Sequence, residues 1–78
     1  KHEINVGKLS KVTKTGDVIA VPGKVLGAGV IEHSITIGAV AFSESAKEKI
    51  KSAGGTIMLI EKLVETNPDG KGVKIFVG

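Results

Sequence analysis

The chain has 78 residues, which is enough for one small domain, and its lack of cysteine excludes disulfides and thiolate metal sites. The net charge is +3, with eleven lysines and no arginine. That balance suits a polyanionic partner, but it also fits lysines that only solvate the surface. No apolar run is long enough to cross a membrane. We expect one globular domain over residues 1–78. Because residue 1 is Lys rather than Met, we also expect the sequence to be a fragment.

The first part of the chain predicts a helix, a strand and a loop. In NVGKLSKVTK, residues 5–14, apolar residues and lysines each recur every three positions, which predicts a helix with one apolar and one basic face. DVIAV, residues 17–21, is a β-branched run typical of a buried strand. Pro22-Gly23 is expected to end that strand, because proline has no N–H for the hydrogen-bond ladder. A glycine-rich loop follows.

The middle of the chain predicts a strand and a capped helix. SITIGAVAF, residues 34–42, is apolar at both sets of alternating positions, which predicts a strand buried on both sides. The helix expected in SESAKEKIKSAGG can be capped by Ser43 or Ser45, and Ser45 with Glu48 fits a capping box. Gly54-Gly55 is expected to end it.

The last part predicts a strand at TIMLI, residues 56–60, and a helix over residues 60–67. Asn67-Pro68-Asp69-Gly70 then fits a type I turn before a final strand, VKIFV, residues 73–77. Helices and strands therefore alternate along the chain. This order predicts an α/β domain with a small, largely parallel sheet.

The stretch VPGKVLGAGVIEH, residues 21–33, does not fit the nucleotide-binding motifs. A P-loop needs Gly-Lys followed by Ser or Thr, whereas Gly23-Lys24 is followed by an apolar residue. A dinucleotide-binding loop needs a third glycine after Gly27 and Gly29, at the position of Glu32. We therefore expect no nucleotide cofactor and no small-molecule substrate.

His33 suggests an alternative function. It follows a glycine-rich loop and precedes a buried strand, a placement loosely similar to that in the phosphohistidine domains of phosphoenolpyruvate-utilising enzymes. Glu32 is adjacent, but at the start of a strand it would point to the opposite face and is poorly placed to orient the imidazole. The competing interpretation is a histidine that hydrogen-bonds the backbone or a phosphate.

Other catalytic arrangements are not supported by the sequence. Ser43 and Ser45 fit helix caps better than nucleophiles, because no histidine lies beside them in the pattern. No cluster of histidine and aspartate fits a metal site. We expect no catalytic residue, no metal and no enzyme activity.

The lysines and glycines together favour a phosphate-binding surface. Glycine-rich backbone approaches a phosphate closely, and lysine adds a mobile point charge. A polynucleotide backbone offers several phosphates at once, and Lys24 lies inside the glycine-rich stretch. The lysines of the predicted capped helix are interpreted differently. Lys47, Lys49 and Lys51 alternate with glutamates, which predicts a solvated face with weak ion pairs.

These residues match the pattern of a known family. The run KVLGAGVIEHSITIGAVAFSESAKEKIKSAGG, residues 24–55, resembles the signature of the ribosomal protein family shared by bacterial large-subunit protein fifteen and archaeal/eukaryotic large-subunit protein eighteen-e. The match rests on Lys24 and Gly27, alternating apolar residues, the unit FSESA, and then Ile50 and Gly54-Gly55. TKTGDVIAVPGKVLG and the turn TNPDG look like the archaeal eighteen-e branch.

The resemblance implies a structural constituent of the large ribosomal subunit, in the cytoplasm, that binds large-subunit ribosomal RNA beside neighbouring ribosomal proteins. It implies an irregular α/β superhelix of strands and helices. It also implies a basic N-terminal region in the whole protein that this sequence lacks. The residues expected at RNA phosphates are Lys8, Lys11, Lys14 and Lys24, and those expected at close approaches or hydrogen bonds are Asn5, Gly23, Gly27 and His33.

Overall fold

The computed structural model of the chain describes residues 2–77, which build one sheet and three short helices. The elements in chain order are β1 (Glu3–Asn5), α1 (Val6–Val12), β2 (Val18–Leu26), β3 (Thr36–Phe42), α2 (Glu44–Ser52), β4 (Thr56–Leu59), α3 (Ile60–Thr66) and β5 (Val73–Ile75). The strand pairs β1–β2, β2–β3, β2–β5 and β3–β4 are all parallel. The prediction of an α/β domain with a small parallel sheet is confirmed.

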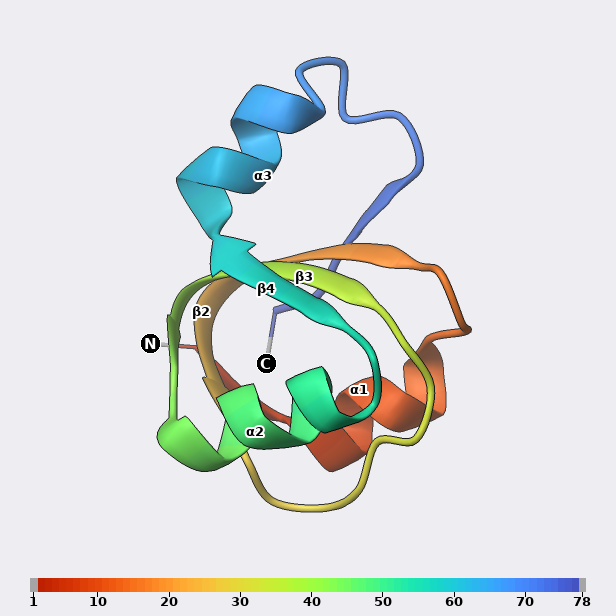
Figure 1. Cartoon of the computed structure of the whole chain (residues 1–78). Helices are drawn as coiled ribbons and strands as arrows, with labels where there is room; N and C mark the ends of the chain where they lie inside the picture. The colour runs from red at the N-terminus through yellow and green to blue at the C-terminus, as the bar shows by residue number, and fades with distance from the viewer. Residues whose placement is uncertain (1, 78) are drawn as a thin grey trace.

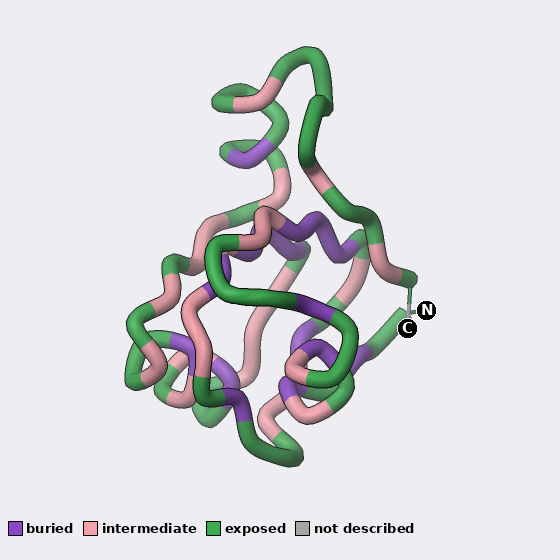
Figure 2. The backbone as a smooth tube through the Cα atoms, turned by 90° about the vertical axis from the view of Figure 1, so that its right-hand side faces the viewer, coloured by how far each residue is buried: buried purple, intermediate pink, exposed green. Residues whose placement is uncertain are grey.

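Strand β2 is the centre of the sheet and pairs with three other strands. One of its edges pairs with β3, which in turn pairs with β4. Its other edge is shared, because residues 18–20 pair with β5 and residues 24–26 pair with β1. The first and last strands of the chain therefore lie end to end along one edge of β2, and the two ends of the chain come together beside it (Figure 2).

The prediction that Pro22-Gly23 ends the strand is wrong, because β2 continues to Leu26. The register with β3 shifts between Val21 and Lys24, so a bulge accommodates the two residues. Pro22 also lies between Ala20, the last residue paired with β5, and Lys24, the first residue paired with β1. At that gap in the ladder the missing N–H of proline costs little.

The main core lies between the sheet and the pair α1 and α2, which cover the same face (Figure 1). Ile37 and Ala39 of β3 point into it and are fully buried. The buried cluster consists of Ile4, Val6, Leu9, Ile19, Val21, Val25, Ile31, Ile35, Ile37, Ala39, Ala46 and Ile50. Each large aliphatic side chain buried this way stabilises the fold by about 1.5–3 kcal/mol relative to exposure.

Helix α3 lies on the opposite face of the sheet and covers only part of it (Figure 1). Its buried Leu63 packs on Gly38, where an added Cβ would lie 2.7 Å from Leu63 Cβ. Val40, two residues further along β3, is 58% exposed. The prediction that this strand is buried on both sides is thus confirmed at Gly38 and wrong at Val40.

Helix α2 is capped by Ser43, whose Oγ accepts a hydrogen bond from the Ala46 N–H at 3.2 Å. Ser45 lies inside the first turn, so the predicted Ser45–Glu48 capping box is wrong. Gly54 follows the helix with φ +84°, a left-handed conformation that ends the helix as predicted.

Helix α1 ends earlier than predicted. Thr13 has extended backbone angles, and its hydroxyl donates to the Leu9 carbonyl at 2.7 Å, which satisfies an acceptor at the end of the helix. Lys14 therefore lies beyond α1, and the predicted basic helical face contains Lys8 and Lys11 only.

The C-terminal elements follow the predicted order but are shorter. Ile60 begins α3 instead of ending β4, and β5 stops at Ile75. The predicted turn is present, because the Gly70 N–H donates to the Asn67 carbonyl at 2.9 Å. The loop between β2 and β3, residues 27–35, contains no helix.

Candidate functional site

The loop between β2 and β3, residues 27–35, is the glycine-rich loop, and it packs directly on the start of α1. The Gly7 N–H donates to the Ala28 carbonyl at 3.0 Å, and the Ala28 N–H donates to Oδ1 of Asn5 at 3.1 Å. Gly29 has φ +90°, and a Cβ there would lie 2.5 Å from Gly7 Cα. Both glycines are needed for this close backbone approach. Asn5, predicted as a hydrogen-bonding position, thus holds the loop onto α1.

A basic hollow lies beside this contact, and we call it the α1 hollow. It is open to solvent, has a volume of about 590 Å³, and is lined by Asn5, Gly7, Lys8, Ser10, Lys11, Ala28, Gly29 and Val30. The charges of its lining come from Lys8 and Lys11, which lie one helical turn apart on α1. The structure therefore brings together three of the predicted residues, namely Asn5, Lys8 and Lys11.

Lys24 and Gly23 lie at a different place on the sheet. They line a second hollow of about 440 Å³ together with His2, Glu3, Pro22 and Val40, and we call it the β2 hollow. Gly23 allows the N-terminal segment to pack closely, because a Cβ there would clash with the His2 carbonyl oxygen. The Lys24 N–H also donates to that oxygen, at 2.9 Å.

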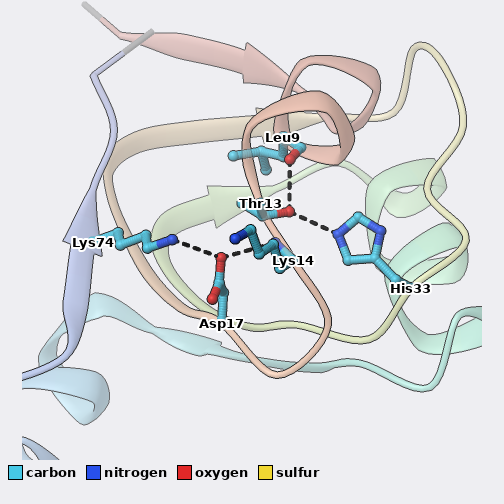
Figure 3. A network of polar contacts seen from close by, with 6 residues as sticks. All are labelled: Leu9, Thr13, Lys14, Asp17, His33 and Lys74. Carbon is cyan, nitrogen blue, oxygen red and sulfur yellow. Dashed lines mark hydrogen bonds and ion pairs between the residues drawn. The ribbon is translucent and has the colours of Figure 1, made fainter.

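Gly27 and His33 lie at internal contacts of the loop. A Cβ on Gly27 would clash with the Ser45 side chain at the start of α2. Nε2 of His33 lies 2.8 Å from Oγ1 of Thr13 (Figure 3). His33 is thus a hydrogen-bonding residue, but its partner here is a threonine side chain rather than the backbone or a phosphate.

Lys14 lies next to a small ionic cluster. Its N–H donates to Oδ2 of Asp17 at 2.8 Å, and Nζ of Lys74 contacts the same oxygen at 3.0 Å (Figure 3). The hydrogen bond from Lys14, followed by the Lys74 ammonium, holds the pKa of the Asp17 carboxyl below its ordinary value. The cluster joins β5 to the start of β2.

Lys49 has a role that the sequence did not indicate. Its Nζ donates to the carbonyl oxygens of Gly27 and Gly29 at 2.6 and 2.7 Å, so it links α2 to the glycine-rich loop. The predicted solvated face is confirmed at Lys47, which pairs with Glu44 at 3.3 Å, and wrong at Lys49. The sequence held no signal for this link, because backbone carbonyls of a distant loop leave no pattern in the helix.

Within residues 2–77, no helix is long and apolar enough to cross a membrane. In the same residues, no three metal-ligating side chains of the His, Cys, Asp and Glu types gather at one point.

Comparison with known proteins gives the chain its class. A family model that describes ribosomal proteins 50S-L15 and 50S-L18e together with their 60S counterpart matches residues 3–58, which is more than half of the chain. The large ribosomal subunit protein eL18 of Methanoregula boonei is 49% identical over 73 residues, covering 94% of this chain and 60% of that protein. The eL18 of Archaeoglobus fulgidus is 47% identical over 75 residues, covering 96% and 64%. That of Methanococcus maripaludis is 47% identical over 75 residues, covering 96% and 62%.

These matches define the class as ribosomal proteins, and the relatives named above are proteins of the large ribosomal subunit. The chain belongs to the family of ribosomal proteins 50S-L15, 50S-L18e and their 60S counterpart. The resemblance seen in the sequence is therefore confirmed, and the alternative of a phosphoryl carrier using His33 is not supported. The chain spans about three-fifths of the length of the curated relatives it matches.

Proposed function

We propose that the chain is a structural constituent of the large ribosomal subunit in the cytoplasm, and that it binds ribosomal RNA through the α1 hollow. The observation that most supports this site is the pairing of Lys8 and Lys11 beside an exposed stretch of glycine-rich backbone. Family membership supports the ribosomal role. In this proposal the RNA, and not a nucleotide or a small molecule, supplies the phosphates.

The chemistry of the α1 hollow suits a phosphate backbone. Two ammonium groups one helical turn apart give point charges on flexible stems, which tolerate the variable spacing of successive phosphates. Ser10 adds a hydroxyl, and the Asn5 side chain carries amide donors besides the oxygen that holds the loop. Contacts of this kind fix the position of a protein on RNA and carry no sequence information.

The other predicted residues take separate parts in the proposal. Lys24 forms a second phosphate contact at the β2 hollow, where Gly23 permits close packing. Lys14 contributes an exposed charge just beyond α1. Gly27 and His33 act indirectly, by holding the loop that forms one wall of the α1 hollow.

Salt titration tests the proposal. Ribosomal RNA extracted from archaeal large subunits is bound to the chain at a series of KCl concentrations. The logarithm of affinity should fall linearly with the logarithm of salt, with a slope of about −0.7 to −0.9 per phosphate contact. K8M and K11M should each lower the affinity and reduce the slope by roughly one contact.

The matched control is K62M, which removes the same charge from an exposed position on α3, across the sheet from α1. It should leave the slope unchanged. Affinity that does not depend on salt contradicts RNA binding of this kind. Equal effects of K8M and K62M would contradict the α1 hollow as the site. K24M separately tests the second contact, at Lys24. That contact is rejected if the salt slope of K24M equals that of the unmodified chain.

Association with neighbouring ribosomal proteins is also part of the proposed function. It is tested by asking whether the chain joins large subunits reconstituted from RNA and the remaining proteins. Failure to join with all other components present would contradict the structural role.

A further inference from the structure

The loop of residues 27–35 joins two parallel strands without a helix, so its backbone groups must find partners elsewhere. The Ala28 carbonyl accepts the Gly7 N–H at 3.0 Å. The carbonyls on either side of it, those of Gly27 and Gly29, both accept from Nζ of Lys49. Three consecutive loop carbonyls are thus bonded, two of them by a single ammonium group.

The loop forms a wall between two hollows. Gly29 and Val30 line the α1 hollow on one side. On the other side the same two residues line a smaller hollow of about 270 Å³, together with Lys49 and Glu48 of α2. Lys49 therefore reaches the loop from the side away from Lys8 and Lys11.

The ammonium group also changes the electrostatics of the wall. Carbonyl oxygens carry partial negative charge, and an unpaired one beside a phosphate would repel it. Lys49 draws the oxygens of Gly27 and Gly29 toward α2 and compensates their charge, with hydrogen bonds of 2.6 and 2.7 Å that are short and charge-assisted.

We propose that Lys49 is a positioning residue for RNA binding: it fixes the glycine-rich loop so that the α1 hollow has the shape and the charge that a phosphate needs, without touching the RNA. The inference rests on the proposed function of the α1 hollow. It assigns Lys49 a role different from that of Lys8 and Lys11, although all three carry the same charge.

RNA titration of three variants separates positioning from direct contact. K49M keeps the aliphatic stem and removes the donors, and K51M removes an exposed charge from the same helix. K49M should bind archaeal large-subunit ribosomal RNA roughly threefold to thirtyfold more weakly with an unchanged salt slope. K51M should change neither quantity. K49R, which retains donors and charge, should recover most of the affinity.

A second readout needs no RNA. Hydrogen exchange of the free protein should show faster exchange at the amides of Gly7 and Ala28 in K49M than in K51M, because both amides bond within the contact that Lys49 holds. If the unmodified chain shows no salt-dependent RNA binding, the proposed function fails. The exchange rates still decide whether Lys49 holds the loop.

Amine labelling of the unmodified chain covers the case in which K49M does not fold. An acylating reagent should modify Lys49 slowly in the free protein and equally slowly with RNA bound. Lys8 and Lys11 should react fast in the free protein and slowly in the complex. The inference is overturned if Lys49 reacts fast in the free protein and is protected only by RNA. It is also overturned if K49M reduces the salt slope by the amount expected for one phosphate contact. Unchanged affinity and unchanged exchange in K49M would overturn it as well.

Discussion

Thr13 and His33 are joined by a hydrogen bond of 2.8 Å that connects the end of α1 to the glycine-rich loop (Figure 3). The Thr13 hydroxyl also lies 2.7 Å from the Leu9 carbonyl oxygen, which can only accept. Since a hydroxyl has one proton, it donates to Leu9 and accepts from His33. In this hydrogen bond Nε2 of His33 is therefore the donor, and its N–H is used in a contact within the protein.

Replacing Thr13 by valine should destabilise the protein by about 1–3 kcal/mol. T13V keeps the shape of the side chain but leaves the Leu9 carbonyl and the His33 N–H without their partner at a buried position. Urea unfolding followed by circular dichroism measures the loss. T13S retains the hydroxyl and should be affected less. Equal stability of T13V and the unmodified chain would show that these bonds contribute nothing.

Alanine at Gly29 should be more damaging than alanine at Gly16. The two glycines have almost the same backbone angle, φ +90° and +88°. A Cβ on Gly16 meets nothing within 4 Å, whereas one on Gly29 lies 2.5 Å from Gly7 Cα. G16A should therefore cost only the left-handed backbone strain, about 1–2 kcal/mol. G29A should cost about 1–3 kcal/mol more, because the loop must move off α1.

The comparison of these two variants is made by thermal and urea unfolding under identical conditions. G29A should also weaken binding of ribosomal RNA, whereas G16A should leave it unchanged. Equal losses of stability in both variants would mean that the contact between Gly7 and Gly29 is not tight in solution.

Asp17 should make the protein less stable in acid. Its pKa is lowered from an ordinary value of 3.8, first by the Lys14 N–H and then by Lys74. A carboxyl whose pKa is lower in the folded state stabilises that state above the ordinary pKa. This stabilisation is lost as the pH falls through the lowered value. The thermal midpoint of the unmodified chain should therefore approach that of D17N as the pH is lowered from about 6 toward about 2.

Two variants control for the acid dependence. E65Q removes an exposed carboxylate from α3. Its thermal midpoint should fall as much on acidification as that of the unmodified chain. K74M should still lose part of this stability on acidification, because the hydrogen bond from the Lys14 backbone N–H is the larger cause of the lowered pKa of Asp17. If the difference in thermal midpoint between D17N and the unmodified chain stayed constant over this pH range, Asp17 would not be the cause of the loss of stability in acid.

The order of elements and the parallel sheet could be predicted from the sequence, because local patterns decide them. The β-branched run at residues 18–21 and the apolar run at residues 36–42 are strands, and the turn at residues 67–70 forms where its side chains indicate. Strand β1 was not predicted, since its three residues pair only with the part of β2 that lies beyond Pro22. A partner so distant in sequence leaves no local signal.

The candidate site was predicted in part for the same reason. The α1 hollow contains Lys8, Lys11 and Asn5, whose spacing along one short segment was visible in the sequence. The position of Gly23 and Lys24 in the β2 hollow depends on the pairing of β1 with β2. The contacts of Gly27 and His33 depend on the path of residues 27–35, which lacks any periodicity. The partners of Lys49 depend on that path too.

The shared edge of β2 has a consequence for solubility. The strands β1 and β5, of three residues each, cover one edge of β2, which is nine residues long and largely apolar. They shield that edge from other molecules. If either of these strands detaches, part of β2 presents unpaired N–H and C=O groups and becomes a template for intermolecular pairing. The resistance of this domain to aggregation thus depends on β1 and β5, although both strands are short and contribute only Ile4 to the buried cluster.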